Sequence, residues 1–272
     1  MIQVKYIHVE SDALAFLGDW QAEVEVLPTH AARKVEADRL WTTKRKNKPF
    51  LDVIVKALDA MVAPHRRCMF CEDNSGYQVE HFWPKAIFPK LTFEWLNFLY
   101  ACGQCNGKKS DRFAVYAPNG DVIEIKKSDD EPSCGFPGLL NPRHENPLDF
   151  LKLDLKPDMF EFGYIPPKGT QAYDRAYRTV EWLGLNKRGL PKWRESAYYD
   201  YRLRLQEYVK KTREGAEPNV LERLERGISR RGHLTVFREM QRQWRDVDEL
   251  KEIFDERPEL QAAEFPRNLE PQ

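Results

Sequence analysis

The chain has 272 residues, of which 42% are hydrophobic and 12% aromatic, and its 43 basic and 43 acidic side chains give a net charge of zero. This length and composition exclude a disordered chain and suffice for one large or two small hydrophobic cores. No apolar run is long enough to span a membrane, and charges interrupt residues 1–16 too often for a signal peptide, so we expect a cytoplasmic protein.

The first 62 residues predict weak strand structure followed by two helices. Residues 1–27 alternate weakly and predict a short strand or two. Thr29 is a favourable cap for a helix over residues 30–46, and Pro49 should end or kink that helix. Apolar residues three and four positions apart then indicate a second, core-facing helix that Pro64 closes. These residues are Leu51, Ile54, Val55, Leu58, Met61 and Val62.

Two Cys-x-x-Cys pairs bracket residues 72–101. The pairs are Cys68 with Cys71 and Cys102 with Cys105. The interval is long enough for a hairpin that brings both pairs around one tetrahedral zinc ion, with Zn–S distances of about 2.3 Å. Two disulfides are the alternative for four cysteines. Four thiolates leave no open position on zinc, so we expect a structural site and look for catalysis in other residues.

Residues 77–82 alternate as a strand that follows a turn at residues 74–76. The strand places Glu80 and His81 at neighbouring positions near its end, which a Trp-Pro pair marks. Because neighbouring strand residues point to opposite faces, both side chains reach one site only where the strand ends or twists. The second cysteine pair leads into a short helix, and the helix completes a ββα unit.

Four side chains in this stretch carry groups suited to metal-assisted hydrolysis. The carboxylate of Glu80 and the amide oxygen of Asn106 are ligands that a hard cation such as Mg²⁺ prefers. A neutral His81 can accept a proton from an attacking water, provided that another group orients the ring. Asn97 is a candidate for that group.

At these residues the chain resembles the HNH (ββα-metal) nuclease family in its zinc-stapled form, whose pattern is Cys-x-x-Cys, Asp/Glu-His, Asn and Cys-x-x-Cys-Asn/His. The resemblance spans residues 68–113. It implies that His81 is the general base, that Asn97 orients it, and that Glu80 and Asn106 bind a catalytic Mg²⁺ or Mn²⁺ beside a structural Zn²⁺. Glu80 stands where Asp is commoner, and Asn106 stands where the family name expects a His.

Basic side chains follow the second cysteine pair. Lys108, Lys109 and Arg112 are interpreted as weak nucleic-acid contacts, and residues 33–48 contain seven Lys and Arg residues, which a solvated helix face would also explain. The net charge of zero nevertheless argues against strong binding by the chain alone, because neutralisation of phosphates supplies most non-specific affinity.

The remaining chain predicts an irregular region followed by helices. Residues 114–140 look irregular apart from a strand over residues 122–127, and Cys134 in this region is interpreted as an ordinary packed thiol. A stretch rich in proline and asparagine follows, with a strand or two. Residues 171–258 are then charged and helical with one break at residues 184–191, and a frayed tail ends the chain.

Segments beyond the cysteine pairs extend the resemblance. Together with the EHFWPK, Trp-x-Asn and Cys-x-x-Cys-Asn elements, the later LLNPR..NPLDFL and RAYRTVEWLGLN...R segments are similar to the HNH proteins of Septu-type anti-phage systems, which some retrons also carry. This resemblance implies control by an ABC/SMC-like ATPase partner. The chain itself has no Walker Gly-x-x-x-x-Gly-Lys motif.

We therefore expect an α+β fold that is mostly helical around a small zinc-stapled ββα-metal (HNH) nuclease unit. The expected parts are a helical segment at residues 1–66, the nuclease core at 67–115, a loop-rich extension at 116–170 and a helical, partner-docking region at 171–272. The expected function is that of an endonuclease that hydrolyses phosphodiester bonds, in DNA or alternatively RNA, in bacterial anti-phage defence. A stand-alone restriction- or toxin-like nuclease and a non-catalytic zinc-binding interaction module are the alternatives.

Overall fold

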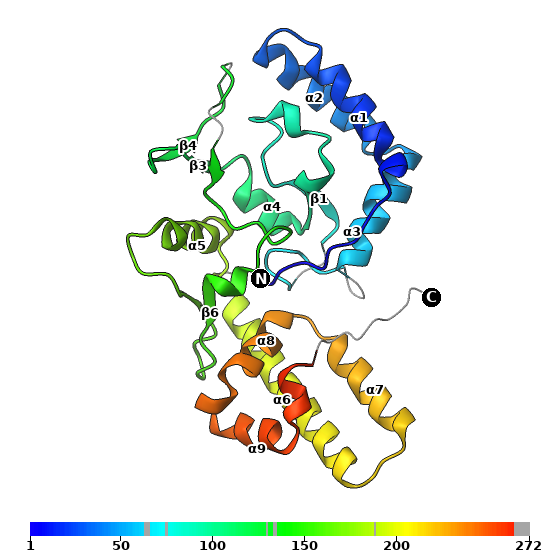
Figure 1. Ribbon diagram of the computed structural model, residues 1–272, viewed down its shortest axis with the longest axis vertical. Coiled ribbons are helices and arrows are strands. Elements are labelled where there is room, and N and C mark those ends of the chain that lie inside the picture. Colours follow the sequence, from blue (N-terminus) through cyan, green and yellow to red (C-terminus); the bar gives the residue numbers. More distant parts are fainter. Residues whose placement is uncertain (63–65, 74–75, 129, 133–134, 188, 264–272) are drawn as a thin grey trace. The chain divides into compact units, whose positions relative to one another are not determined.

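The computed structural model describes residues 1–62, 66–73, 76–128, 130–132, 135–187 and 189–263 (Figure 1). Contacts divide the chain into two compact units. The larger unit comprises Ile2–Leu151 and Tyr164–Leu185, and the smaller unit comprises Met1, Lys152–Gly163 and Asn186–Gln272. Helices hold 53% of the residues and strands 10%, which confirms a mostly helical α+β fold.

Helix α1 corrects the strand predicted for residues 1–27. The helix spans Ser11–Glu25, and its buried residues are Leu17, Trp20 and Val24. Because these residues are three and four positions apart, they form one apolar helix face, which packs against α2. The helical spacing of these apolar residues therefore decided the local structure, and the weak alternation of apolar and polar residues did not.

Helix α2 spans His30–Lys44 and begins at the predicted cap. The Thr29 Oγ1 atom accepts a hydrogen bond from the Ala32 N–H at 3.2 Å, which satisfies one backbone donor of the first turn. The helix ends before Pro49, as predicted.

A π-helical turn over Phe50–Val55 continues into helix α3, Lys56–Met61. Ile54, Leu58 and Met61 are buried, which confirms the predicted core-facing helix. Leu51 is 46% exposed, because the wider π turn shifts the residues that face the core away from the expected α-helical spacing.

The cysteine-rich stretch forms a ββα unit in the larger unit. Strand β1 (Gln78–His81) pairs antiparallel with β2 (Phe98–Ala101), and His81 lies opposite Phe98. Short 3₁₀ turns at Pro89–Leu91 and Trp95–Asn97 lie in the connection between them. Helix α4 (Gly103–Lys109) follows β2 directly, so the predicted order of two strands and a helix is confirmed.

The region predicted as irregular contains a small sheet with the order β4-β3-β5. Its strands are β3 (Phe113–Tyr116), β4 (Val122–Ile125) and β5 (Phe136–Pro137). The predicted strand at residues 122–127 is confirmed, whereas β3 was missed. All four residues of β3 are buried, so this strand shows a short apolar run instead of the alternation of a half-exposed strand. Strands β6 (Leu151–Leu153) and β7 (Phe162–Tyr164) confirm the strand or two predicted beyond the stretch rich in proline and asparagine.

The rest of the chain is helical, as predicted. Helix α5 (Gln171–Leu183) belongs to the larger unit and ends at Gly184, whose left-handed φ of 62° stops the helix. The smaller unit holds the helices α6 (Leu190–Arg213), α7 (Pro218–Ser229), α8 (Leu234–Gln243) and α9 (Asp248–Glu256), with 3₁₀ turns at Trp244–Asp246 and Pro258–Gln261. The four-part division of the chain stays a prediction.

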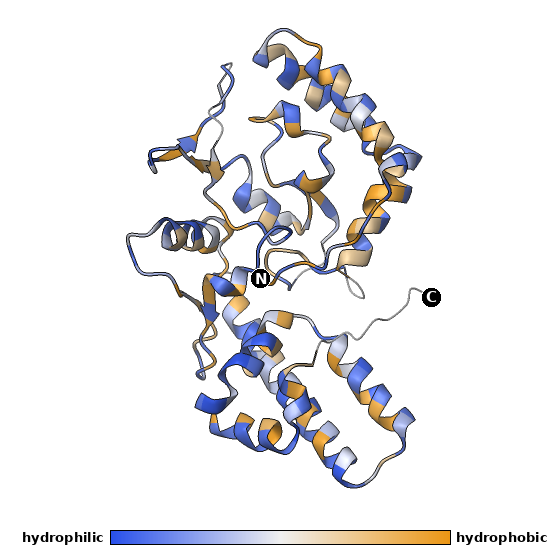
Figure 2. Cartoon of the chain, viewed as in Figure 1, coloured by the Kyte–Doolittle hydropathy of each residue, from blue (hydrophilic) through white to orange (hydrophobic). Residues whose placement is uncertain are grey.

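Apolar and polar residues are interspersed along the helices (Figure 2). No helix in the described parts of the chain is long and apolar enough to cross a membrane. The predictions made for Pro64, residues 74–75, Cys134 and the end of the tail at 264–272 lie outside the described residues.

The cap of α2 gives a stability prediction. Thr29→Ala should lower the free energy of unfolding by about 1 kcal/mol, because the Ala32 N–H loses its acceptor. Thr43→Ala is the matched control, since the Thr43 hydroxyl donates to the carbonyls of Arg39 and Leu40 inside the same helix and caps nothing. Chemical denaturation should show a change within about 0.5 kcal/mol for the control. Equal losses in both variants would contradict the cap's contribution.

Candidate functional site

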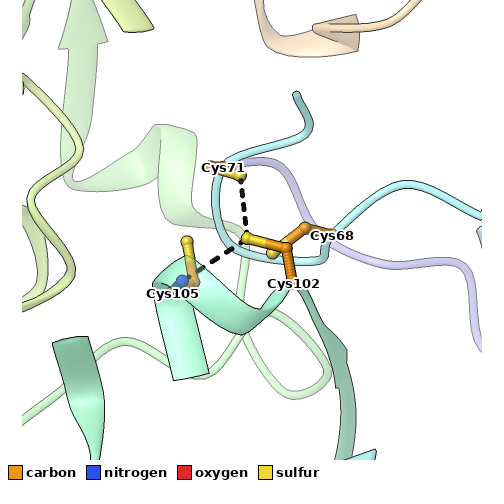
Figure 3. A group of neighbouring side chains, drawn as sticks. All are labelled: Cys68, Cys71, Cys102 and Cys105. Atoms are coloured by element: carbon orange, nitrogen blue, oxygen red, sulfur yellow. Dashed lines mark hydrogen bonds between the residues drawn. The ribbon is translucent and has the colours of Figure 1, made fainter. Parts of the chain in front are cut away.

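The four predicted cysteines form one buried cluster (Figure 3). Cys68 and Cys71 lie in the loop that precedes β1, whereas Cys102 caps α4 and Cys105 lies in its first turn. Their sulfur atoms all lie within 4.8 Å of one another, with 3.9 Å between the Sγ atoms of Cys71 and Cys102. The described cysteines are free thiols, so the disulfide alternative is not what the structure shows.

The cluster fits a tetrahedral zinc ion. Zn–S bonds of about 2.3 Å place neighbouring sulfurs about 3.8 Å apart at the corners of a tetrahedron, close to the Cys71–Cys102 separation. Burial raises the pKa of the Cys68 thiol, while hydrogen bonds from Cys105, Cys68 and Cys71 lower the pKa of Cys102. Four buried thiolates would repel one another strongly, and a divalent cation would remove that penalty.

Backbone contacts pin the first cysteine pair against β2. The Met69 N–H donates to the Tyr100 carbonyl at 2.9 Å, in the middle of the loop that carries Cys68 and Cys71. Gly76 then lets the chain pass close to this loop, because a Cβ atom there would lie 3.1 Å from Arg67 O and 3.2 Å from the Cys68 Cα. The cysteine cluster therefore brings the loop before β1 together with the start of α4.

His81 is buried at the end of β1, with 5% of its surface exposed. Its ring lies edge-on to Trp41 of α2, with 4.4 Å between centroids, and contacts Phe98 of β2 at 5.4 Å. The Nε2 atom lies 2.9 Å from the Thr92 carbonyl oxygen, which can only accept a hydrogen bond. In the neutral ring Nε2 must therefore carry the proton, and Nδ1 holds the basic lone pair.

The surroundings keep the His81 ring neutral. Burial lowers the pKa of His81 to about 3, and the positive charges of Lys85 and Lys109 act in the same direction, while the hydrogen bond to Thr92 opposes them. A ring with this pKa is unprotonated at neutral pH, as a general base must be before it accepts a proton.

Asn97 stabilises the loop between the two strands through side-chain hydrogen bonds to Trp83 and Leu91. Its amide nitrogen donates to the carbonyls of Trp83 and Leu91 at 3.0 and 2.8 Å, and its amide oxygen accepts from the Trp83 N–H at 2.7 Å. Leu91 precedes Thr92, so Asn97 stabilises the segment whose carbonyl orients the ring. The His81 ring itself donates its hydrogen bond to the Thr92 carbonyl, a partner that the sequence motifs did not predict.

Glu80 forms a buried ion pair with Lys109 of α4. The Lys109 ammonium lies 2.7 Å from Glu80 Oε1 and also donates to the His81 carbonyl at 2.8 Å. Burial raises the pKa of Glu80, the Lys109 charge opposes this effect, and the Asp111 charge adds to it. Lys109 has no exposed surface, so the structure corrects its interpretation as a nucleic-acid contact. Lys108 and Arg112 are exposed.

Glu80, His81 and Asn106 line one pocket of about 400 Å³. Asn106 donates from its amide nitrogen to Gln78 Oε1 at 2.8 Å, so this hydrogen bond does not occupy its amide oxygen. The residues that line the pocket are Trp41, Gln78, Val79, Glu80, His81, Pro84, Lys85, Gly103, Asn106, Gly107, Ser110 and Asp111. Three of the four predicted catalytic residues thus line one pocket, and Asn97 is not among its lining residues.

Two charged residues that line the pocket, Lys85 and Asp111, were not predicted from the sequence. Asp111 follows α4 and forms an ion pair with Lys127 at 2.5 Å. Its signal in the sequence was its place five residues after Asn106, just beyond the short helix that carries Asn106. Lys85 follows the Trp-Pro pair that ends β1, and no motif marked it as a pocket residue.

Comparison with known proteins finds a partial relative. The chain is 34% identical over 62 residues to a protein named "Septu protein PtuB" from Bacillus thuringiensis. The matched stretch covers 23% of this chain and about a quarter of the length of that relative, 24%. No family model and no solved structure matches the chain. The chain is therefore partly homologous to a Septu protein.

The cysteine cluster gives a metal-removal prediction. Cys102→Ser should lose bound zinc and unfold the ββα unit, because structural zinc contributes roughly 10 kcal/mol or more to folding in small zinc domains. Elemental analysis and limited proteolysis measure the two effects. Asn106→Ala is the control, since it removes a pocket side chain and no thiol, and it should keep its zinc. Full zinc retention by the Cys102 variant would show that the cluster is not the zinc site.

Proposed function

We propose that this protein is a metal-dependent nuclease that hydrolyses phosphodiester bonds. The observation that supports this function best is the state of His81, a neutral, oriented imidazole in the lining of a pocket that also carries acidic and amide oxygens. A module that only binds zinc and a partner has no need for a buried histidine whose tautomer is set by a backbone carbonyl. The combination therefore favours an enzyme over a zinc-binding interaction module.

The pocket oxygens suit a hard divalent cation. Glu80 and Asn106 would hold Mg²⁺ or Mn²⁺, and Asp111 adds a second carboxylate to the same lining. When bound, such an ion would stabilise the negative charge that builds up on the phosphate during hydrolysis. The ion pair with Lys109 would hold Glu80 in place for this purpose.

His81 would then accept a proton from the attacking water at Nδ1. The Thr92 carbonyl would stabilise the resulting imidazolium, because it accepts the hydrogen bond from Nε2 in both protonation states. A pKa of about 3 makes the free ring a weak base. A phosphodiester anion in the pocket would raise this pKa, since a nearby negative charge favours the protonated ring.

We further propose that the nuclease acts on DNA as the effector of an anti-phage defence system. The support is the partial homology to a Septu protein and the resemblance of further segments to that class. The same resemblance implies an ATPase partner, and the net charge of zero is consistent with a nuclease that needs a partner for firm binding.

Assays of the purified chain distinguish the alternatives. Plasmid DNA, single-stranded DNA and RNA should be incubated with Mg²⁺ or Mn²⁺, with and without the product of a neighbouring ATPase gene. Cleavage that requires the ATPase supports the Septu-like effector, whereas strong cleavage by the chain alone favours a stand-alone nuclease. Cleavage of no substrate in any combination would leave the zinc-binding module as the remaining candidate.

Substitution of His81 tests the catalytic assignment. His81→Gln should lower the cleavage rate by about 10²- to 10⁴-fold, because the amide can still donate to Thr92 O but cannot accept the proton of a water. His81→Ala should have the same effect on the rate, and both variants should keep their zinc. His144→Ala is the control, since His144 is exposed and does not line the pocket. Unchanged turnover in the Gln variant would show that another group is the base.

A further inference from the structure

Among the described residues that line the active-site pocket, Lys85 carries the one lysine or arginine side chain, and Glu80 and Asp111 carry the carboxylates. Hydrogen bonds from the N–H groups of Ile87 and Phe88 to the Pro84 carbonyl, at 2.9 and 2.8 Å, form a turn directly after β1. This turn holds Lys85 beside the exit of the strand that carries His81. The Lys85 side chain is 24% exposed, so it can meet a ligand from solvent.

The Lys85 ammonium forms an ion pair with Asp38 of α2. The Asp38 side chain is 70% exposed, so this carboxylate lies at the surface while its partner lines the pocket. Trp41, on the next turn of the same helix, contacts the His81 ring. Helix α2 therefore supplies both a wall of the pocket and the carboxylate at its edge.

The charges of the pocket make Lys85 the attractive group for an anion. Glu80 is paired with Lys109, and Asp111 is paired with Lys127, so both acidic side chains are partly neutralised by cations of their own. Lys85 is paired with the exposed Asp38, and an exposed ion pair contributes little stability because water solvates both charges. A phosphate oxygen presents the same kind of negative acceptor as a carboxylate and can replace it.

We propose that Lys85 binds a non-bridging oxygen of the phosphodiester substrate and that Asp38 competes with the substrate for this lysine. The proposal rests on the proposed nuclease function and assigns a residue pair that controls access of nucleic acid to that site. Asp38 acts as an internal substitute for phosphate. Nucleic acid that binds weakly leaves the Lys85–Asp38 pair intact, and a firmly held strand displaces it.

Binding measurements on the full-length chain test this competition. His81→Gln is used as the background so that nucleic acid is bound and not cut, and labelled duplex DNA, single-stranded DNA and RNA are the probes. Asp38→Asn should tighten binding by up to about fivefold, the equilibrium equivalent of one exposed ion pair. Lys85→Gln should weaken binding and reduce the slope of log affinity against log salt by about 0.9 on duplex DNA.

Asp52→Asn is the matched control. It removes the same charge from an exposed ion pair, with Lys56, outside the pocket, and it should change affinity less than Asp38→Asn does. Asp38→Asn should also lose its effect when Lys85 is already Gln. The probe that shows the largest effect identifies the backbone that the pocket holds, and an effect on any of the three supports the competition.

The outcomes separate this inference from the function on which it rests. If the chain cuts nucleic acid but Asp38→Asn acts no more strongly than Asp52→Asn, the competition is wrong and the nuclease stands. If Lys85→Gln leaves the salt slope unchanged, Lys85 binds no phosphate. If the wild-type chain neither binds nor cuts any probe, alone or with the ATPase, both proposals are overturned.

Discussion

The convergence of four buried thiols is the constraint on which the geometry of the candidate site depends. Cys68 and Cys71 come from the loop before β1, and Cys102 and Cys105 come from the start of α4, so their contact holds that loop against the junction of β2 and α4. With the start of α4 held beside β1, the far end of the helix brings Lys109 to Glu80 and to the His81 carbonyl. A small unit with three short elements has little core of its own, and a metal ion bound by these thiols would compensate for that.

The His81 ring is held by elements outside that unit. Trp41 of α2 closes one side of the His81 ring, and the Thr92 carbonyl, in the loop that Asn97 braces, sets its tautomer. Helix α2 is therefore part of the site and more than a supporting layer. The same helix α2 presents Asp38 to Lys85, so one element both shapes the pocket and modifies its charge.

Local spacing predicted much of this protein. The two Cys-x-x-Cys pairs, the Glu80-His81 strand and the short helix at the second pair were all placed correctly. Each is defined by residues within a few positions of one another. The errors also have local causes. Helix α1 contains a weak alternation that resembles a strand, and β3 is buried along its whole length, so its apolar run carries no period of two.

By itself, the sequence determined which chemical groups are present. These are four thiols in two Cys-x-x-Cys pairs, the carboxylate of Glu80 next to His81, and the amides of Asn97 and Asn106. Only the tertiary structure decided which groups meet. It buried Lys109 against Glu80, set Thr92 rather than Asn97 against His81, and brought Asp38 to Lys85. These pairs lie 11 to 47 residues apart in the chain. Contacts at such separations follow from how helices and strands pack, and the spacing of residues along the sequence does not encode them.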